Sequence, residues 1–199
     1  MTGPQDWVPE TVAPTTPKAI VAVPAAGRID LRGRRLLIGL PGFGWRGDLR
    51  GDAAIVQASR TYVPVLPEHE WYRAEAEQIE VFAPLVPIDR VWAEIEADTN
   101  TPASTLPPAD LFGRLVSLDS PPRREPVPIR DIMGVTGRRI VQAEGDSATR
   151  DLRAVTEPYQ NTEGDICVRI CTELDWYRWG WSGKPPRTRE VPIYMTWVE

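Results

Sequence analysis

Residues 68–73 read Glu68-His69-Glu70-Trp71-Tyr72-Arg73, and residues 173–178 read Glu173-Leu174-Asp175-Trp176-Tyr177-Arg178. The second stretch follows the first by 105 residues, and Val191-Pro192-Ile193 follows Val86-Pro87-Ile88 by the same distance. Nine of the 27 positions from 68 to 94 carry the same residue in both copies, two tryptophans among them. An internal repeat of this kind indicates the architecture before any local pattern is considered.

Two weaker matches extend the repeat upstream. Gly33-Arg34-Arg35 matches Gly137-Arg138-Arg139 at a separation of 104 residues, and Asp48-Leu49-Arg50 matches Asp151-Leu152-Arg153 at 103. Small changes of separation are typical of loop insertions, because connections tolerate changes of length better than strands do. We therefore expect two related units of roughly 70 residues, a size at which a core is thin and leans on a neighbour or a partner.

Proline divides the rest of the chain. Residues 1–27 contain five prolines and residues 97–129 contain seven, a density that excludes regular helix and favours extended backbone. We expect an extended arm over 1–27, a first β-barrel repeat over 28–96, a connector over 97–129 and a second β-barrel repeat over 130–199. Leucines at helical spacing predict one short helix over residues 109–118 of the connector.

The fold class expected is mainly β, with two tandem small barrels. Short apolar runs such as Leu36-Leu37-Ile38, and the alternation over residues 166–171, predict strands. Residues 70–81 contain good helix formers, but the second copy reads Trp179-Gly180-Trp181-Ser182-Gly183, which favours strand and turn for both. By size and strand pattern each unit resembles an SH3-like or Tudor-like barrel, and this resemblance is architectural only.

Composition limits the classes of partner and compartment. The net charge of -5 gives no basic field for nucleic acid. No apolar run approaches the length of a membrane span, and no signal-peptide pattern opens the chain, so we expect a cytoplasmic or virion-associated protein without a membrane partner. On one strand Cys167 and Cys171 lie too far apart for a disulfide, and we expect two small buried hydrophobic residues.

The tryptophans suggest both a core and a binding surface. Those repeated in both copies are expected to form the cores: Trp71, Trp92, Trp176 and Trp197. Large aromatic residues present in one copy only, or beside arginine in a loop, are typical of contact surfaces. The candidate partner-binding residues are therefore Trp7 of the arm and Trp45 and Arg46 of the loop over residues 39–47. To these we add Tyr177, Trp179 and Trp181, which share one face of an expected strand in the second copy.

No pattern predicts catalysis, a metal or a cofactor. Residues 42–47 spell G-x-G-x-x-G, but two further breakers follow where a dinucleotide site needs a helix. His69 is the single histidine, and with two strand cysteines it does not supply a zinc site. The carboxylates of the stretch Glu68–Glu80 are interpreted as a solvated face rather than an active site.

We therefore predict a non-catalytic protein-binding or assembly module built from two β repeats. Its nearest variant is a structural subunit of a larger particle, such as a phage virion, in which the chain self-assembles. Two alternatives come from other classes. The chain could be a hydrolase that uses the acidic stretch Glu68–Glu80, or a single-stranded nucleic-acid binder that uses aromatic platforms.

Overall fold

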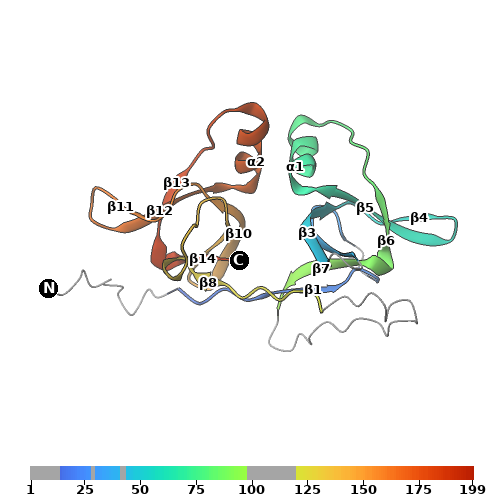
Figure 1. The fold of residues 1–199 in the computed structure, drawn as a ribbon, viewed down its shortest axis with the longest axis horizontal. Coiled ribbons are helices and arrows are strands. Elements are labelled where there is room, and N and C mark those ends of the chain that lie inside the picture. The colour runs from blue at the N-terminus through green and yellow to red at the C-terminus, as the bar shows by residue number, and fades with distance from the viewer. Residues whose placement is uncertain (1–13, 28–29, 41–43, 98–119) are drawn as a thin grey trace. The chain divides into compact units, whose positions relative to one another are not determined.

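The computed structural model describes residues 14–27, 30–40, 44–97 and 120–199. Trp7 and the helix expected over residues 109–118 lie outside these ranges. The chain divides into two compact units. The first unit is Ala19–Arg124, and the second unit is Glu125–Glu199 together with the segment that ends at Lys18. Each unit is a curled antiparallel sheet with one α-helix (Figure 1).

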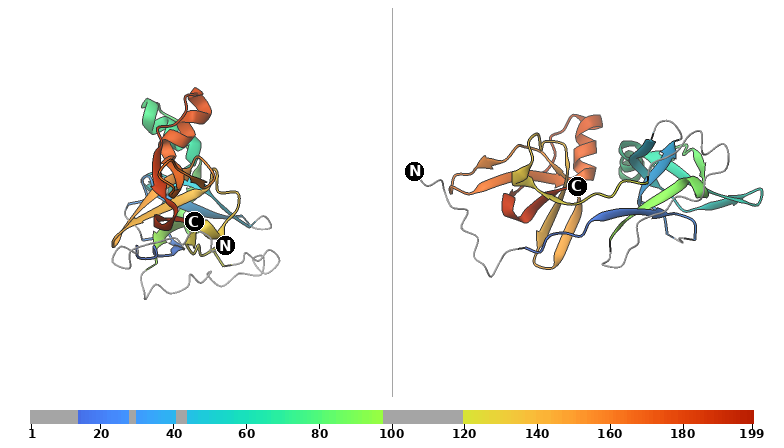
Figure 2. Two further views of the ribbon diagram at one scale, coloured as in Figure 1. Left: turned by 90° about the vertical axis from the view of Figure 1, so that its left-hand side faces the viewer. Right: turned by 60° about the horizontal axis from the view of Figure 1, so that its bottom comes forward.

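The sheet of the first unit has the order β1-β7-β2-β3-β5-β4, and β6 pairs with the free side of β5. Its strands are β1 (Ile20–Pro24), β2 (Arg35–Leu40), β3 (Gly44–Gly51), β4 (Ile55–Gln57), β5 (Arg60–Pro67), β6 (Leu85–Pro87) and β7 (Val91–Glu96). Helix α1 (Glu68–Glu77) connects β5 to β6, and the 3-10 turn η2 (Ile88–Arg90) connects β6 to β7. The hairpin of β4 and β5 extends away from the rest of the unit (Figure 2).

The second unit has the same strand order, β8-β14-β9-β10-β12-β11, with β13 paired to β12. Its strands are β8 (Val127–Pro128), β9 (Arg139–Glu144), β10 (Ser147–Ala154), β11 (Tyr159–Gln160), β12 (Ile166–Thr172), β13 (Arg189–Pro192) and β14 (Thr196–Val198). The turn η3 (Ile129–Asp131) follows β8, helix α2 (Glu173–Ser182) connects β12 to β13, and the turn η4 (Ile193–Met195) connects β13 to β14.

Each sheet curls around its own apolar core because alternate strand residues point inward. The core of the first unit is Ala25, Leu31, Leu36, Leu49, Val63, Val65, Val91 and Ala93. That of the second is Ile129, Val135, Ile140, Leu152, Ala154, Val168, Ile170, Val191 and Val198. The prediction of a mainly β chain is confirmed. Two segments expected in the arm and connector belong to the sheets, because residues 20–24 form β1 and residues 127–128 form β8.

The prediction of strand and turn over residues 70–81 is wrong, because residues 68–77 and 173–182 are α-helices. Thr172 caps α2 by accepting a hydrogen bond at Oγ1 from the Asp175 amide at 3.1 Å, and Gly183 ends it with φ of +70°. Packing outweighs the poor helix propensity of glycine and tryptophan here. Tyr177 and Trp181 are four residues apart and therefore lie on one side of α2. The strand face expected to hold Tyr177, Trp179 and Trp181 together does not form.

The two cysteines lie on β12 and are buried and free, as predicted. Burial raises the pKa of Cys171 to about 11 and also raises the pKa of Cys167. Within the described ranges, neither α-helix is long and apolar enough to cross a membrane.

Candidate functional site

Helix α1 is fixed to its sheet by a buried ion cluster. Glu68 is 1% exposed, and its Oε1 lies 3.5 Å from Nε of Arg50 and 3.9 Å from Nε of Arg35. Arg50 also donates to the Tyr72 hydroxyl at 2.8 Å and to the Gly33 carbonyl at 2.7 Å. The cluster therefore joins β2, β3 and the first two turns of α1.

Helix α2 is fixed by the same set of residues in the second unit. Glu173 is fully buried, with Oε1 at 3.0 Å from Nε of Arg153 and 3.3 Å from Nε of Arg139. Arg153 donates to the Tyr177 hydroxyl at 2.9 Å and to the Gly137 carbonyl at 3.1 Å. Tyr177 therefore takes part in the attachment of the helix.

A glycine lies against the repeated tryptophan of each helix. A Cβ added at Gly33 would approach Cζ2 of Trp71 to 3.2 Å, and one added at Gly137 would approach Cζ2 of Trp176 to 3.4 Å. Both glycines also have positive φ, of +70° and +82°, which favours glycine. The two tryptophans therefore have matching surroundings.

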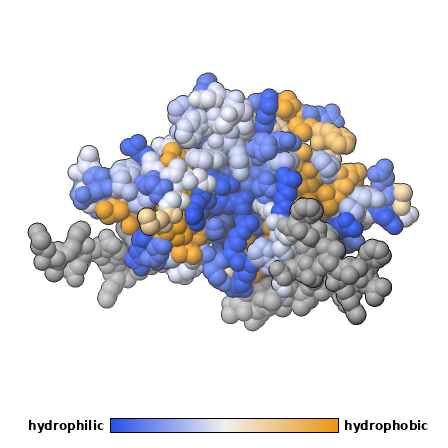
Figure 3. All heavy atoms as spheres, in the orientation of Figure 1, coloured by the Kyte–Doolittle hydropathy of each residue, from blue (hydrophilic) through white to orange (hydrophobic). Residues whose placement is uncertain are grey.

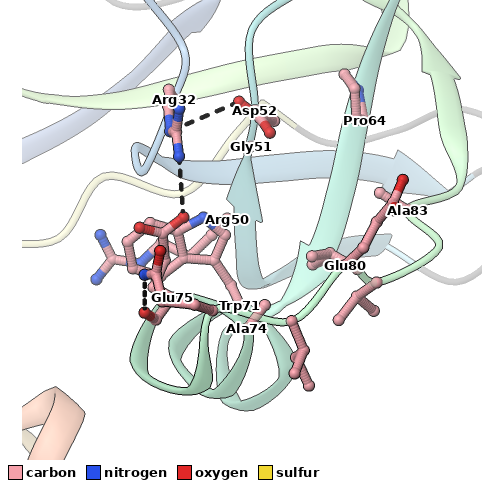
Figure 4. A pocket seen from close by; sticks show the side chains of 14 residues that line it. Arg32, Arg50, Gly51, Asp52, Pro64, Trp71, Ala74, Glu75, Glu80 and Ala83 are labelled. Carbon is pink, nitrogen blue, oxygen red and sulfur yellow. Dashed lines mark hydrogen bonds and ion pairs between the residues drawn. The ribbon is translucent and has the colours of Figure 1, made fainter.

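A pocket of about 520 Å³ opens beside α1 (Figure 4). On one side Arg32 lies between two carboxylates, at 3.2 Å from Oε1 of Glu75 and 3.9 Å from Oδ1 of Asp52. The rest of the lining is mixed, with the polar side chains of Arg50, Gln78 and Glu80 beside Gly51, Pro64, Leu66, Trp71, Ala74, Ile79, Val81 and Ala83. The pocket therefore presents apolar side chains together with several charged and polar groups.

The two helices differ at the position beside this pocket. Ala74 is the seventh residue of α1 and lines the pocket, and Trp179 is the seventh residue of α2. The Trp179 ring packs edge to face on Trp176, with centroids 5.7 Å apart. An indole therefore lies beside the repeated tryptophan in the second unit, where alanine leaves open space in the first.

An apolar face continues from the pocket across the first unit. Tyr62 pairs with both Ile55 and Pro87, and Pro64 pairs with Leu85, so these residues lie on one face of the sheet. The loop after α1 adds Ile79 and Phe82, of which Phe82 is 89% exposed. Apolar side chains gather over this loop and the adjoining strands (Figure 3). We call Ile55, Tyr62, Pro64, Ile79, Phe82 and Leu85 the apolar face.

In the second unit, hydrogen-bonded polar groups cover the corresponding face. The equivalent register pairs Cys167 with Tyr159 and with Pro192, and pairs Arg169 with Glu190. The Tyr159 hydroxyl donates to Glu190 and accepts from Nε of Arg169 at 3.0 Å. Asn161 donates to the other Glu190 oxygen at 3.0 Å. Arg169 and Glu190 thus stand where the first unit has Pro64 and Leu85.

The predicted core tryptophans divide into two classes. Trp92 and Trp197 are buried at 5% and 6% exposure. Trp71 and Trp176 are half-buried under their glycines.

The described partner-binding candidates belong to β3 of the first unit and to α2 of the second. Trp45 and Arg46 lie on β3 rather than in a loop, where Trp45 packs on Trp92 at 4.8 Å and Arg46 pairs with Asp48 at 2.9 Å. On α2, Trp179 is 39% exposed and Trp181 is half-buried.

Sequence reasoning missed the apolar face. The available signal was that Phe82 and Leu85 correspond to charged residues in the second copy.

No family model, curated protein or solved structure matches the chain. Among the described residues, no group of three or more His, Cys, Asp or Glu side chains could hold a metal ion. The pocket and the apolar face of the first unit are therefore the features from which we infer a function.

The polar cover of the second unit predicts a pH effect. Hydrogen bonds from Tyr159 and Asn161 lower the pKa of Glu190, so its stabilising contribution is present above the unfolded-state pKa and is lost as pH falls through the folded one. Glu190→Gln is expected to lower the urea midpoint at pH 7 and to reduce its further fall between pH 5 and pH 3. The exposed Glu163→Gln serves as control, and identical pH profiles for all three proteins would contradict the expectation.

Proposed function

We propose that the chain is a non-catalytic protein-binding and assembly module made of two SH3-like barrels that arose by duplication. Three observations support the duplication: the shared strand order, the shared cluster of two arginines, a glutamate and a tyrosine, and the shared packing of glycine on tryptophan. The copies have since diverged on their outer faces. The first unit carries the binding surface.

The observation that carries the proposal is the contrast between the two outer faces. Monomeric proteins rarely expose large contiguous apolar patches, and such patches rimmed by polar groups are typical of interaction sites. Phe82, Ile79 and Leu85 are exposed at 89%, 44% and 40% beside an open pocket. In the second unit Arg169 and Glu190 cover the same strands. A face left uncovered in only one of two similar units supports recognition of a partner.

The acidic stretch Glu68–Glu80 supports binding better than hydrolysis. Glu68 is buried and held by Arg35 and Arg50, which leaves it without the access to solvent and substrate that a catalytic acid needs. Glu75 pairs with Arg32 and Glu77 with Arg73. Glu68 therefore attaches the helix, Glu75 lines the pocket, and Glu77 pairs within the helix.

The proposal is tested by photo-crosslinking from the apolar face. A photoreactive phenylalanine analogue is placed at Phe82 in the full chain, expressed in the organism that encodes it, and the same analogue at Met133 is the control. Met133 is 91% exposed but lies in the second unit. We expect protein adducts from position 82 that Leu85→Glu removes, and none from position 133. Equal yields from both positions would contradict the proposal.

One observation favours a second candidate function, the binding of single-stranded nucleic acid. Trp179 is partly exposed at the end of α2, and Lys184, Arg187 and Arg189 follow it. An aromatic platform beside cationic groups is the usual means of holding unpaired bases. Fluorescence anisotropy with labelled oligonucleotides, repeated at two salt concentrations, tests it.

A further inference from the structure

We propose that the protein partner of the first unit is a second copy of this chain, bound head to tail. The pocket and apolar face beside α1 of one copy receive the exposed end of α2 and residues 183–189 of the next. This inference rests on the proposed function, because it names the partner of the same surface.

The corresponding segments of the two units have opposite charge. Residues 70–85 contain four carboxylates and one arginine, a net charge of -3, whereas residues 175–190 contain two carboxylates and four cations, a net charge of +2. The side chains of Glu75, Glu77 and Glu80 are exposed in the first segment, and those of Lys184 and Arg187 in the second. Complementary fields of this kind steer association and set its register.

The apolar parts of the two surfaces are complementary as well. The first unit offers an open pocket of about 520 Å³ beside Trp71 and Ala74, within the range of roughly 300–1,000 Å³ typical of binding pockets. The second unit offers Trp179, a 39% exposed indole. Trp179 already packs edge to face on Trp176. If Trp179 of one copy inserts beside Trp71 of the next, its exposed edge gains the same kind of aromatic contact. Trp71 suits this role because a glycine lies against it as one lies against Trp176.

The two surfaces lie on different units, so the contact is heterologous rather than isologous. A bound pair then keeps one unused surface of each kind, one on each copy, and association continues into rings or open chains. A two-fold contact would instead stop at a dimer. Growth beyond the dimer, weakened by salt, is therefore the expected behaviour of the wild-type chain.

The test uses two charge-reversal variants of the full chain. Variant A carries Glu75→Lys and Glu80→Lys, and variant B carries Lys184→Glu and Arg187→Glu. All four positions are exposed, and circular dichroism with urea midpoints matched to the wild type verifies folding. In sedimentation velocity we expect the wild type to form oligomers and each variant alone to associate at least tenfold more weakly.

An equimolar mixture of the two variants tests the head-to-tail contact directly. Variant A keeps the cationic surface and variant B keeps the acidic one, and the two reversed surfaces are again opposite in charge. The mixture is therefore expected to regain the association that each variant alone loses, with copies of A and B alternating. A mixture that stays monomeric, or a wild type that stays monomeric at millimolar concentration, overturns the inference. Adducts from position 82 with a different protein would overturn it while leaving the proposed function intact. Loss of oligonucleotide binding in variant B, without self-association of the wild type, would instead favour the nucleic-acid alternative.

Discussion

Replacing Glu173 with alanine is expected to lower the free energy of unfolding of the second unit by about 3–5 kcal/mol, the usual cost of removing one partner from a buried ion pair. Arg139 and Arg153 both point at this carboxylate, at 3.3 Å and 3.0 Å. Without it, two guanidinium groups in a poorly hydrated place lose a neutralising charge. The amides of α2 are then expected to exchange fastest, because the cluster is the main polar link between helix and sheet.

Hydrogen exchange read by mass spectrometry measures this effect separately in each unit, since peptides from residues 19–97 report on the first and peptides from residues 125–199 on the second. Glu77→Ala is the matched control. Glu77 forms an exposed helical pair with Arg73 at 3.0 Å, a type worth about 0.3–0.5 kcal/mol. Similar effects for the two variants would show that burial does not strengthen the cluster.

A triple variant separates unpaired charge from lost packing. Glu173→Leu combined with Arg139→Met and Arg153→Met removes every charge of the cluster but keeps its volume. Buried ion clusters replaced in this way are often as stable as before, or more stable. We therefore expect the triple variant to recover most of the stability that Glu173→Ala loses.

The buried cluster also shows how much of the fold the sequence predicts. The strongest matches between the copies surround Glu68 and Trp71, and the weak upstream matches are Gly33-Arg34-Arg35 and Asp48-Leu49-Arg50. In the structure Arg35 and Arg50 are the residues that reach Glu68, and Gly33 lies on Trp71. The weak and strong matches therefore belong to one three-dimensional unit. Periodicity could not reveal this, because the contacts join segments far apart in sequence.

The helices were missed for a related reason. The run from Trp179 to Gly183 is unfavourable to a helix by propensity alone. The attachment of the first turn of α2 to the sheet outweighs this propensity. The apolar face was missed because it depends on strand register. Only the pairing of Pro64 with Leu85 places them on one surface, and a shift by one residue would place them on opposite faces. The sequence shows that Leu85 corresponds to Glu190 in the second copy. It does not show that this difference leaves an apolar surface on the first unit.

Trp92, by contrast, was predicted as a core residue, and it is expected to be among the most costly side chains to remove. It is 5% exposed, packs with Ala22 and Leu37, and meets Trp45 edge to face at 4.8 Å. Trp92→Ala is expected to cost about 3–5 kcal/mol, because a cavity is added to the lost transfer free energy. Exchange of peptides from β2 and β7 measures the loss.

Trp92→Phe distinguishes packing from hydrogen bonding as the source of that cost. The buried Nε1 of Trp92 has no hydrogen-bond partner among the described residues, so the indole N–H is a liability that phenylalanine removes. The substitution still fills most of the space, and swaps that keep most of the volume usually cost less than about 1.5 kcal/mol. If Trp92→Phe were as destabilising as Trp92→Ala, the N–H would have to be bonded in solution. A small cost would instead assign the stabilising role of this repeated tryptophan to ring packing against Trp45 and Leu37.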